Sequence, residues 1–199
     1  MKFGTNEIVA LIVATSFAAG LNVYATIATL GLLAHARLFS LPESLGLLNN
    51  WWIIGASLVL FAIEFFADKI PAFDLIWNAL HTFVRVPIAA LMAYAASSQL
   101  SPAEQVVATL GGGTIAFAAH GGKTAVRTLV TPSPEPFSNI TLSLAEDVFA
   151  VFLTWFATRH PYSAAGVVLT LLTTIVVLLR WVARSLRGLF RGSKQELAR

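Results

Sequence analysis

The 199-residue sequence contains no cysteine, and its charged residues are few. Without thiols the chain can form no disulfide bond, and it has no thiolate nucleophile and no Cys-ligated zinc or iron–sulfur site. Charged residues make up 12% of the sequence, whereas soluble domains contain roughly 25%. So few charges cannot solvate an ordinary protein surface. A water-soluble globular protein is therefore excluded, and we expect lipid to be the solvent.

Long apolar segments dominate the chain. Hydrophobic residues make up 57% of the sequence, and the mean hydropathy is +0.76. Most of these segments reach the roughly 17 to 25 residues that a helix needs to cross a bilayer. The sequence therefore predicts an all-α, polytopic membrane helix bundle, a single transmembrane domain over residues 1–199. About six transmembrane helices are expected: Ile8 to Ala34, Asn50 to Ala67, Leu75 to Ser97, Ala103 to Ala119, Ile140 to Thr158 and Tyr162 to Trp181.

The distribution of basic residues predicts the orientation in the membrane. The first apolar segment is longer than a signal-peptide core and lacks a small-residue cleavage site, so we expect it to be retained. An even number of crossings places both termini on one side, and 11 of the 13 Lys and Arg residues then share that side, with Arg37 and Arg159 opposite. Because basic loops stay in the cytosol, the prediction is N-in/C-in. The basic tail, residues 184–199, is interpreted as part of this topology signal, and no nucleic-acid partner is expected.

Glycine, arginine, proline and asparagine residues recur in the same order in the two halves of the chain. An offset of 90 residues superposes several marker residues in the same order, namely Gly31 on Gly121, Arg37 on Arg127, Pro42 on Pro132, Asn49 on Asn139 and Pro71 on Pro161. Three spans followed by three similar spans form an inverted-topology duplication. We therefore predict a 3+3 inverted-topology repeat, with halves at about residues 7–100 and 101–187.

The first and fourth spans, which correspond in this repeat, both contain glycine among polar residues. Gly20-Leu21-Asn22 interrupts the first span, and Gly111-Gly112-Gly113 interrupts the fourth. Paired broken helices at a repeat interface are a sequence pointer to a transport site, so the first and fourth helices are predicted to be broken. The alternative is that these glycines only allow close helix packing, which requires no ligand.

Polar and charged residues recur at helical spacing within the spans. They are costly in a membrane unless they are paired or hydrated, and their spacing places them on shared helix faces in the cytoplasmic half. We expect them to converge on one polar vestibule. The predicted substrate or proton pathway comprises Asn22, Glu64, Asp74, Asn78, His81, Arg85, Gly112, His120, Lys123, Arg127, Glu146 and Asp147.

The acids of this vestibule have two interpretations. They can form structural ion pairs, Glu64 with Arg85, and Glu146 or Asp147 with Lys123 or Arg127. Alternatively, Glu64 or Glu146 carries a proton and exchanges its internal partner for a solute.

Other kinds of site find little support in the sequence. Two histidines on different helices are too few for a metal site. The stretch Gly121 to Thr124 lacks the earlier glycine and the preceding strand of a phosphate-binding P-loop. No nucleophile–base spacing emerges either, so we expect no enzyme activity, no metal and no cofactor.

Several motifs together resemble a known family. They are Ala19 to Asn22, Asp68 to Pro71, His120-Gly-Gly-Lys123 with Arg127, Ser133 to Asn139, and Glu146-Asp147. The combination is similar to the bacterial membrane family catalogued as domain of unknown function 4126. The resemblance covers nearly the whole chain. It implies an integral protein of the bacterial inner (cytoplasmic) membrane and assigns no catalytic residue.

Two functions remain from the sequence. The first is a small membrane carrier or permease that moves a small polar or anionic solute, with proton coupling open, through the cytoplasmic-side vestibule. The alternative is a non-transporting membrane scaffold or lipid-binding module whose buried charges are structural. The expected partners are the lipid bilayer and a small polar or anionic solute or a lipid headgroup, and a homo-oligomer is compatible with the sequence.

Overall fold

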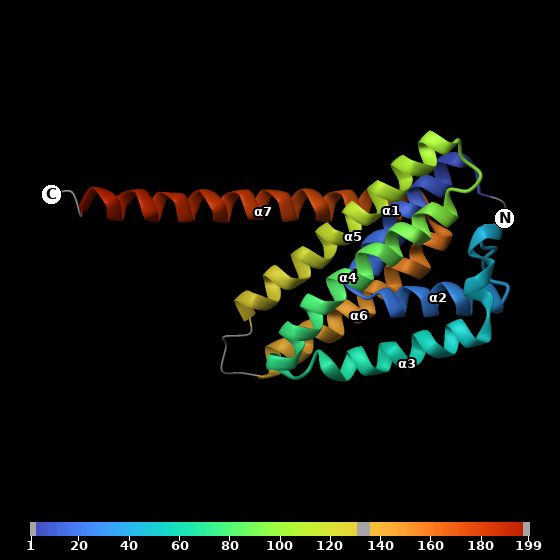
Figure 1. Ribbon diagram of the computed structural model, residues 1–199, viewed down its shortest axis with the longest axis horizontal. Helices are drawn as coiled ribbons and strands as arrows, with labels where there is room; N and C mark the ends of the chain where they lie inside the picture. The colour runs from blue at the N-terminus through green and yellow to red at the C-terminus, as the bar shows by residue number, and fades with distance from the viewer. Residues whose placement is uncertain (1–2, 131–135, 197–199) are drawn as a thin grey trace.

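The computed structural model describes the backbone of residues 3–130 and 136–196; the side chains of residues 71–75, 128–130, 136–139, 182–183 and 185–196 are not described. Within these ranges every regular element is helical, which confirms the predicted all-α class. The elements are α1 (Thr5–Leu21), α2 (Val23–His35), the 3-10 helix η1 (Glu43–Asn49), α3 (Trp51–Ala67), α4 (Pro71–Ala96), α5 (Pro102–Val130), α6 (Pro136–Arg159) and α7 (Pro161–Glu196) (Figure 1).

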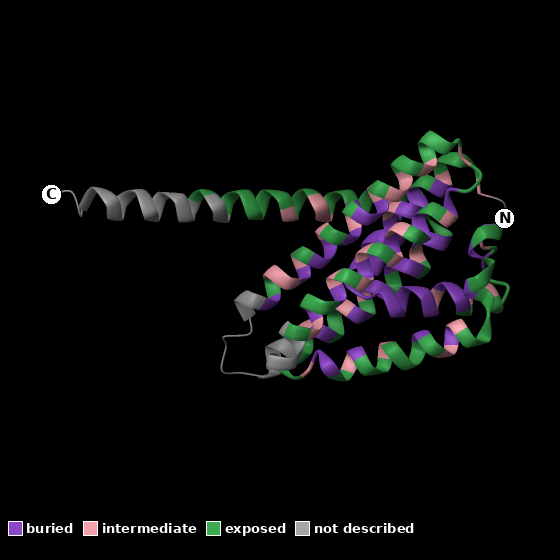
Figure 2. Cartoon of the chain, in the orientation of Figure 1, coloured by how far each residue is buried: buried purple, intermediate pink, exposed green. Residues whose placement is uncertain are grey.

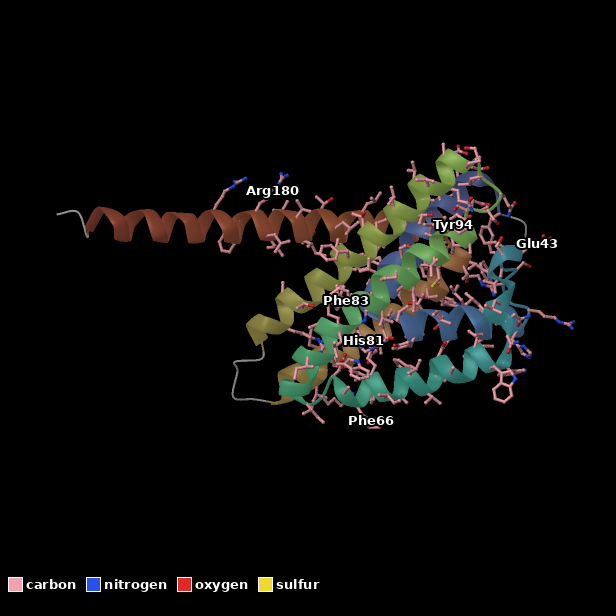
Figure 3. The ribbon with its side chains drawn as sticks, viewed as in Figure 1. Glu43, Phe66, His81, Phe83, Tyr94 and Arg180 are labelled. Carbon is pink, nitrogen blue, oxygen red and sulfur yellow. The ribbon has the colours of Figure 1, made fainter. Side chains whose placement is uncertain are left out.

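Several of these helices have the length and composition of membrane spans. Segments of α4, α6 and α7 qualify individually, and η1 with α3 forms a fourth candidate that is bent by 64°. Large apolar side chains cover the outside of the bundle; Trp52 is 87% exposed and Phe83 is 81% exposed. Figure 3 shows Phe66, Phe83 and Tyr94 on this outer surface. Such a surface is suited to lipid rather than to water.

The first predicted span is broken, as expected, but it is not a single crossing. Asn22 has extended backbone angles (φ −150°, ψ 104°) between α1 and α2, and its side chain accepts a hydrogen bond of 2.9 Å from the amide of Ala25. This is an N-cap, and it starts α2 in a new direction. The rings of Phe3 and Phe39 are 5.4 Å apart, so α2 returns to the end of the bundle at which α1 begins (Figure 1). The expectation of one span from Ile8 to Ala34 is wrong.

This reversal also changes the relation between the two ends of the chain. The beginning of α1 lies beside the α4–α5 turn, because Phe3, Ile8, Ser98 and Gln99 line one cavity. The last helix starts after Arg159 at this same end, and α7 extends past the opposite end of the bundle (Figure 1). Among the described residues, α4, α6, α7 and the bent pair of η1 and α3 are candidate membrane spans, whereas α1 and α2 are shorter apolar helices. The predicted placement of both termini on one side of the membrane stays a prediction.

Helix α5 is continuous from Pro102 to Val130, so the predicted break in the fourth span is wrong. Its glycines instead permit close contact between helices. A Cβ atom on Gly112 would lie 2.6 Å from Cβ of Ala93 on α4 and 2.9 Å from Oγ of Ser16 on α1. Close packing of small residues stabilises helix association in membranes, and here it offsets the low helix propensity of glycine.

Helix α1 forms the centre of the bundle. It is buried along most of its length and packs against α4, α5, α6 and α7 (Figure 2). It runs parallel to α5, since Ser16 faces Gly112, Gly20 faces Ala116 and the carbonyl of Leu21 faces Lys123. The predicted inverted repeat would make the first and fourth spans antiparallel, so α1 cannot be the counterpart of α5.

The neighbouring glycines of α5 provide a test of this packing. We expect Gly112→Ala to destabilise the protein by about 1 to 3 kcal/mol, because α1 or α4 must move to admit the methyl group. A Cβ on Gly111 meets no atom within 4 Å, so Gly111→Ala should be neutral or stabilising by up to about 1 kcal/mol. Thermal unfolding in detergent micelles measures both variants. Equal stability of the two would contradict the described contact.

Candidate functional site

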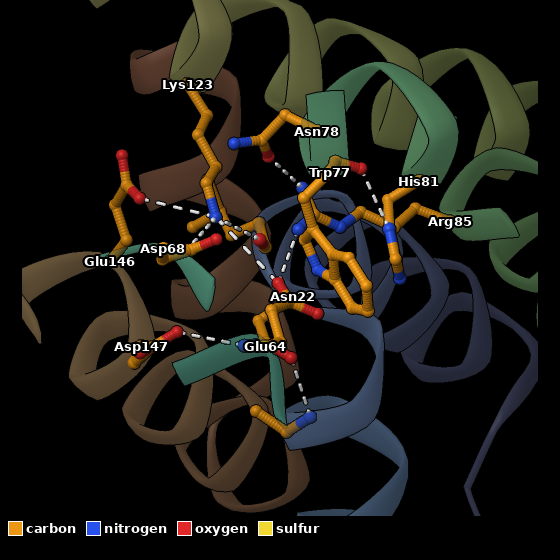
Figure 4. A network of polar contacts seen from close by, with 12 residues as sticks. Asn22, Glu64, Asp68, Trp77, Asn78, His81, Arg85, Lys123, Glu146 and Asp147 are labelled. Atoms are coloured by element: carbon orange, nitrogen blue, oxygen red, sulfur yellow. Dashed lines mark hydrogen bonds and ion pairs between the residues drawn. The ribbon is translucent and has the colours of Figure 1, made fainter. Parts of the chain in front are cut away.

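Polar side chains from α3, α4, α5 and α6 meet that of Asn22, between α1 and α2, inside one end of the bundle. Figure 4 shows acids from α3 and α6 around the cations of α4 and α5, beside the break between α1 and α2. Most of these side chains are fully buried, which membrane and protein interiors allow only when charges are paired. The members are Asn22, Glu64, Asp68, Asn78, His81, Arg85, His120, Lys123, Arg127, Glu146 and Asp147, and we refer to them as the buried network.

Arg85 organises the α3–α4 side of the buried network. Its guanidinium forms an ion pair with Glu64, and Nη1 donates to Oδ1 of Asn78 at 3.1 Å and to Nδ1 of His120 at 2.7 Å. Nδ1 of His120 is therefore an acceptor, and its Nε2 lies 3.1 Å from the carbonyl oxygen of Asn78 and 2.8 Å from Oγ1 of Thr82. This pattern assigns His120 a neutral ring with its proton on Nε2.

Lys123 and Arg127 form the second part of the buried network, on α5. They share two acids, because both cations contact Oδ2 of Asp68 (3.2 and 2.9 Å) and both contact Oε2 of Glu146 (3.4 and 2.6 Å). The Glu146 side chain is 10% exposed, whereas those of Lys123 and Arg127 are 0% and 1% exposed. Glu146 therefore marks the accessible edge of the cluster.

The helix break at Asn22 is joined directly to these charges. Where α1 ends, the carbonyl of Leu21 has no further helical turn to bond with, and Nζ of Lys123 donates to it at 3.2 Å. A cation is also favoured there by the negative end of the helix dipole. Nδ2 of Asn22 donates to Oδ1 of Asp147 on α6 at 2.9 Å. The break is thus fixed by α5 on one side and by α6 on the other.

Asp147 differs from the other acids of the buried network. It is 3% exposed, and among the residues that the structure describes it has no cation within 4.0 Å. The network holds four acids and three bases, so Asp147 is the acid in excess. Some buried oxygens also lack a hydrogen-bond partner within the described part of the chain: Oε2 of Glu64, Oδ1 of Asp68 and Oδ2 of Asp147.

The structure thus gathers most of the residues that the sequence singled out. The anticipated structural pairs are formed, Glu64 with Arg85 and Glu146 with Lys123 and Arg127. Asp147 bonds to Asn22 rather than to a cation. Gly112 belongs instead to a packing layer about 12 Å along α5 from His120, and Asp74 is one of the residues whose side chain is not described.

Three groups that belong to the buried network or contact it are missing from the predicted pathway. Asp68 lies one turn after Glu64, and this spacing places it on the same helix face of the vestibule, although the predicted pathway omits it. Tyr24 lies 3.2 Å from Nε2 of His81, whose Nδ1 donates to the carbonyl of Trp77. The Leu21 carbonyl acts through the backbone, which no side-chain pattern reveals. Within the described residues no group of three or more His, Cys, Asp or Glu could hold a metal ion.

A family model described as "Domain of unknown function (DUF4126)" matches residues 9–181. The chain belongs to this family. The match includes α2 to α6, most of α1, the first part of α7 and every member of the buried network. Searches of curated proteins and of solved structures found no match. DUF4126 membership confirms the resemblance drawn from the sequence motifs, and it leaves the activity to be inferred from the site.

Two asparagine caps allow the role of the break to be tested. Asn22 caps α2 and binds Asp147, whereas Asn50 caps α3 at an exposed position through a bond of 2.8 Å to the amide of Trp52. We expect Asn50→Ala to cost about 1 kcal/mol, the usual cost of a lost cap. Asn22→Ala should cost about 1 to 3 kcal/mol more, since it leaves a buried carboxylate without a donor. Thermal unfolding of both variants measures the difference, and equal losses would show that the Asn22–Asp147 bond does not matter.

Proposed function

We propose that this DUF4126 protein is a small proton-coupled carrier that moves a small polar or anionic solute through the cytoplasmic-side vestibule. The observation that carries the proposal is the position of Glu146. Its side chain is 10% exposed, and one of its oxygens contacts both Lys123 and Arg127. An anionic solute that reaches this edge can take the place of the carboxylate without leaving either cation unpaired.

Solute binding and proton uptake are coupled because an unpaired buried charge is unfavourable. Without Glu146, Asp68 alone would balance both Lys123 and Arg127. An uncompensated buried charge costs about 3 to 5 kcal/mol, so Glu146 leaves only when another anion replaces it. In this proposal the displaced Glu146 carboxylate has lost its two cation partners and takes up a proton as the solute binds. One solute anion and one proton enter together, and the total charge of the buried network stays constant.

The second candidate function is that of a non-transporting scaffold in which the buried charges are structural. Arg85, Lys123 and Arg127 all have acid partners, and a scaffold would need nothing more. The fully buried pair of Glu64 and Arg85 fits this role best, because neither side chain is exposed. We assign that pair to stability and the edge at Glu146 to transport.

The proposed setting is the bacterial inner membrane, with the axis of the bundle along the membrane normal. Helices α3 to α7 then cross, whereas α1 and α2 form a pair that enters from the external side and returns to it, because the 13 residues of α2 are too few to cross. Placing the N-terminus outside moves Lys2 to the external side, so the cytosolic count falls from 11 to 10 of the 13 Lys and Arg residues. The basic excess still favours a cytosolic buried network and C-terminal tail.

The inverted repeat is retained in this proposal with different halves. We relate α2–α4 to α5–α7 and leave α1 outside the repeat. The 90-residue offset superposes Pro71 on Pro161, and these prolines are the first residues of α4 and α7. Superposition of these halves in an experimental structure, by a rotation about an axis in the membrane plane, tests the relation; halves that superpose only in parallel would refute it.

The absence of cysteine makes the topology directly measurable. We expect single cysteines introduced by Thr5→Cys and Ser98→Cys to react with an impermeant maleimide added outside intact cells. A cysteine introduced by Ser193→Cys should react only after the cells are permeabilised. Protection of the Thr5→Cys variant together with the Ser193→Cys variant would restore the N-in/C-in arrangement and overturn the orientation proposed here.

The carrier is tested with the purified protein in liposomes. A set of small anions should include at least one whose uptake is driven by an imposed proton gradient. Glu146→Gln should abolish this proton dependence while the protein stays folded, because glutamine cannot give up a proton. Glu104→Gln, at the exposed start of α5, is the control and should transport normally. Glu64→Gln should lose folded protein, because it leaves Arg85 unpaired. Uptake by Glu146→Gln that keeps its pH dependence would reject the mechanism.

A further inference from the structure

A groove on the outer surface of the bundle lies between α3 and α6. Its volume is about 400 Å³, within the range of small-molecule sites. The rings of Phe61 and Phe65 from α3 and of Phe152 and Trp155 from α6 line it, together with aliphatic side chains of α6 and with Asp147. The two helices pack little against each other, because α3 packs mainly on α2.

Asp147 is the one charged residue among those that line this groove. Its Oδ1 accepts the hydrogen bond from Asn22, whereas its buried Oδ2 has no partner within the described chain. The nearest cations, Lys123 and Lys69, attract Asp147 from a distance, but neither forms an ion pair with it and each has its closest contacts elsewhere. Lys123 contacts Asp68 and Glu146. Nζ of Lys69, at the end of α3, donates to the carbonyl of Phe65 at 2.7 Å and lies 3.0 Å from the centre of its ring.

Each component of the groove selects for a particular part of a ligand. Aromatic and aliphatic walls bind an apolar body. A buried carboxylate without a cation, beside the further acids Glu64 and Asp68, favours a positive group and repels a negative one. The rings add cation–π attraction, and the position of Lys69 over Phe65 shows that one of them already accepts a cation. The exposed faces of Val148 and Phe152 open the groove toward the surrounding lipid.

We propose that the α3–α6 groove binds a lipophilic amine from the membrane, with its apolar body between the aromatic rings and its ammonium group donating to Asp147. This site is separate from the anion-exchanging edge at Glu146. The ammonium group supplies both the charge and the hydrogen bond that the Asp147 carboxylate lacks.

The test uses the full chain in phosphatidylcholine nanodiscs, with empty nanodiscs as the measure of simple partitioning. The probe is 4-phenylbutylamine, and its neutral counterpart is 4-phenylbutanol. We expect saturable binding of one amine per chain, with the alcohol binding about tenfold more weakly or worse. Asp147→Asn should weaken the amine by about tenfold and leave the alcohol nearly unchanged.

A second pair of variants keeps the test decisive where Asp147→Asn fails to fold. Val151→Trp fills the groove from α6 and should block both probes, whereas Val177→Trp, on the exposed face of α7, should block neither. Glu146→Gln should bind the amine like the unaltered protein, which separates this site from the proposed carrier mechanism. Equal binding of amine and alcohol, or normal amine binding by Val151→Trp, would overturn the proposal.

Discussion

The ammonium group of Lys123 holds three distant parts of the chain together in the interior. It contacts Asp68 at the end of α3, Glu146 on α6 and the carbonyl of Leu21 at the end of α1. A buried cation must have such partners to be tolerated at all. The position at which α1 ends, and the approach of α3 and α6 to that position, are therefore linked through one side chain.

The remainder of the bundle is held by close contact between small residues. Van der Waals packing, rather than the hydrophobic effect, associates helices surrounded by lipid, and it requires close approach of the backbones. Gly20 and Gly112 provide this approach between α1 and α5, so α1 lies in the centre while large apolar residues face outward. Among the described residues the buried charges gather at one end, and the interior of the remaining part of the bundle is apolar and tightly packed.

Two adjacent acids on α6 have different surroundings, and this separates the two proposed binding activities. Successive residues of an α-helix point about 100° apart. Glu146 consequently turns toward Lys123 and Arg127, at the accessible edge of the buried network. Asp147 turns toward Asn22 and the α3–α6 groove, where none of the described cations forms an ion pair with it. The first environment is suited to an anion and the second to a cation, although the two Cα atoms are neighbours in the chain.

The sequence by itself determined the features that depend on local periodicity and composition. Scarce charge and long apolar runs predicted a helical membrane bundle, and the helical spacing of Glu64, Arg85, Lys123 and Glu146 predicted that these charges face inward and meet. The motifs around His120 and Glu146 were sufficient to indicate the family. Each of these properties depends on the residues of single helices. It is therefore the same for every arrangement of the helices that buries the same faces.

Only the tertiary structure decided how the helices are joined and directed. The sequence indicated a break at Asn22 but not that α2 turns back, because one extended residue can lead the chain in many directions. The direction is selected by contacts with residues far along the chain, Leu21 with Lys123 and Asn22 with Asp147. The same contacts leave Asp147 outside the ion pairs that the described residues form. In α5, where glycine suggested a second break, close packing against α1 and α4 keeps the helix continuous.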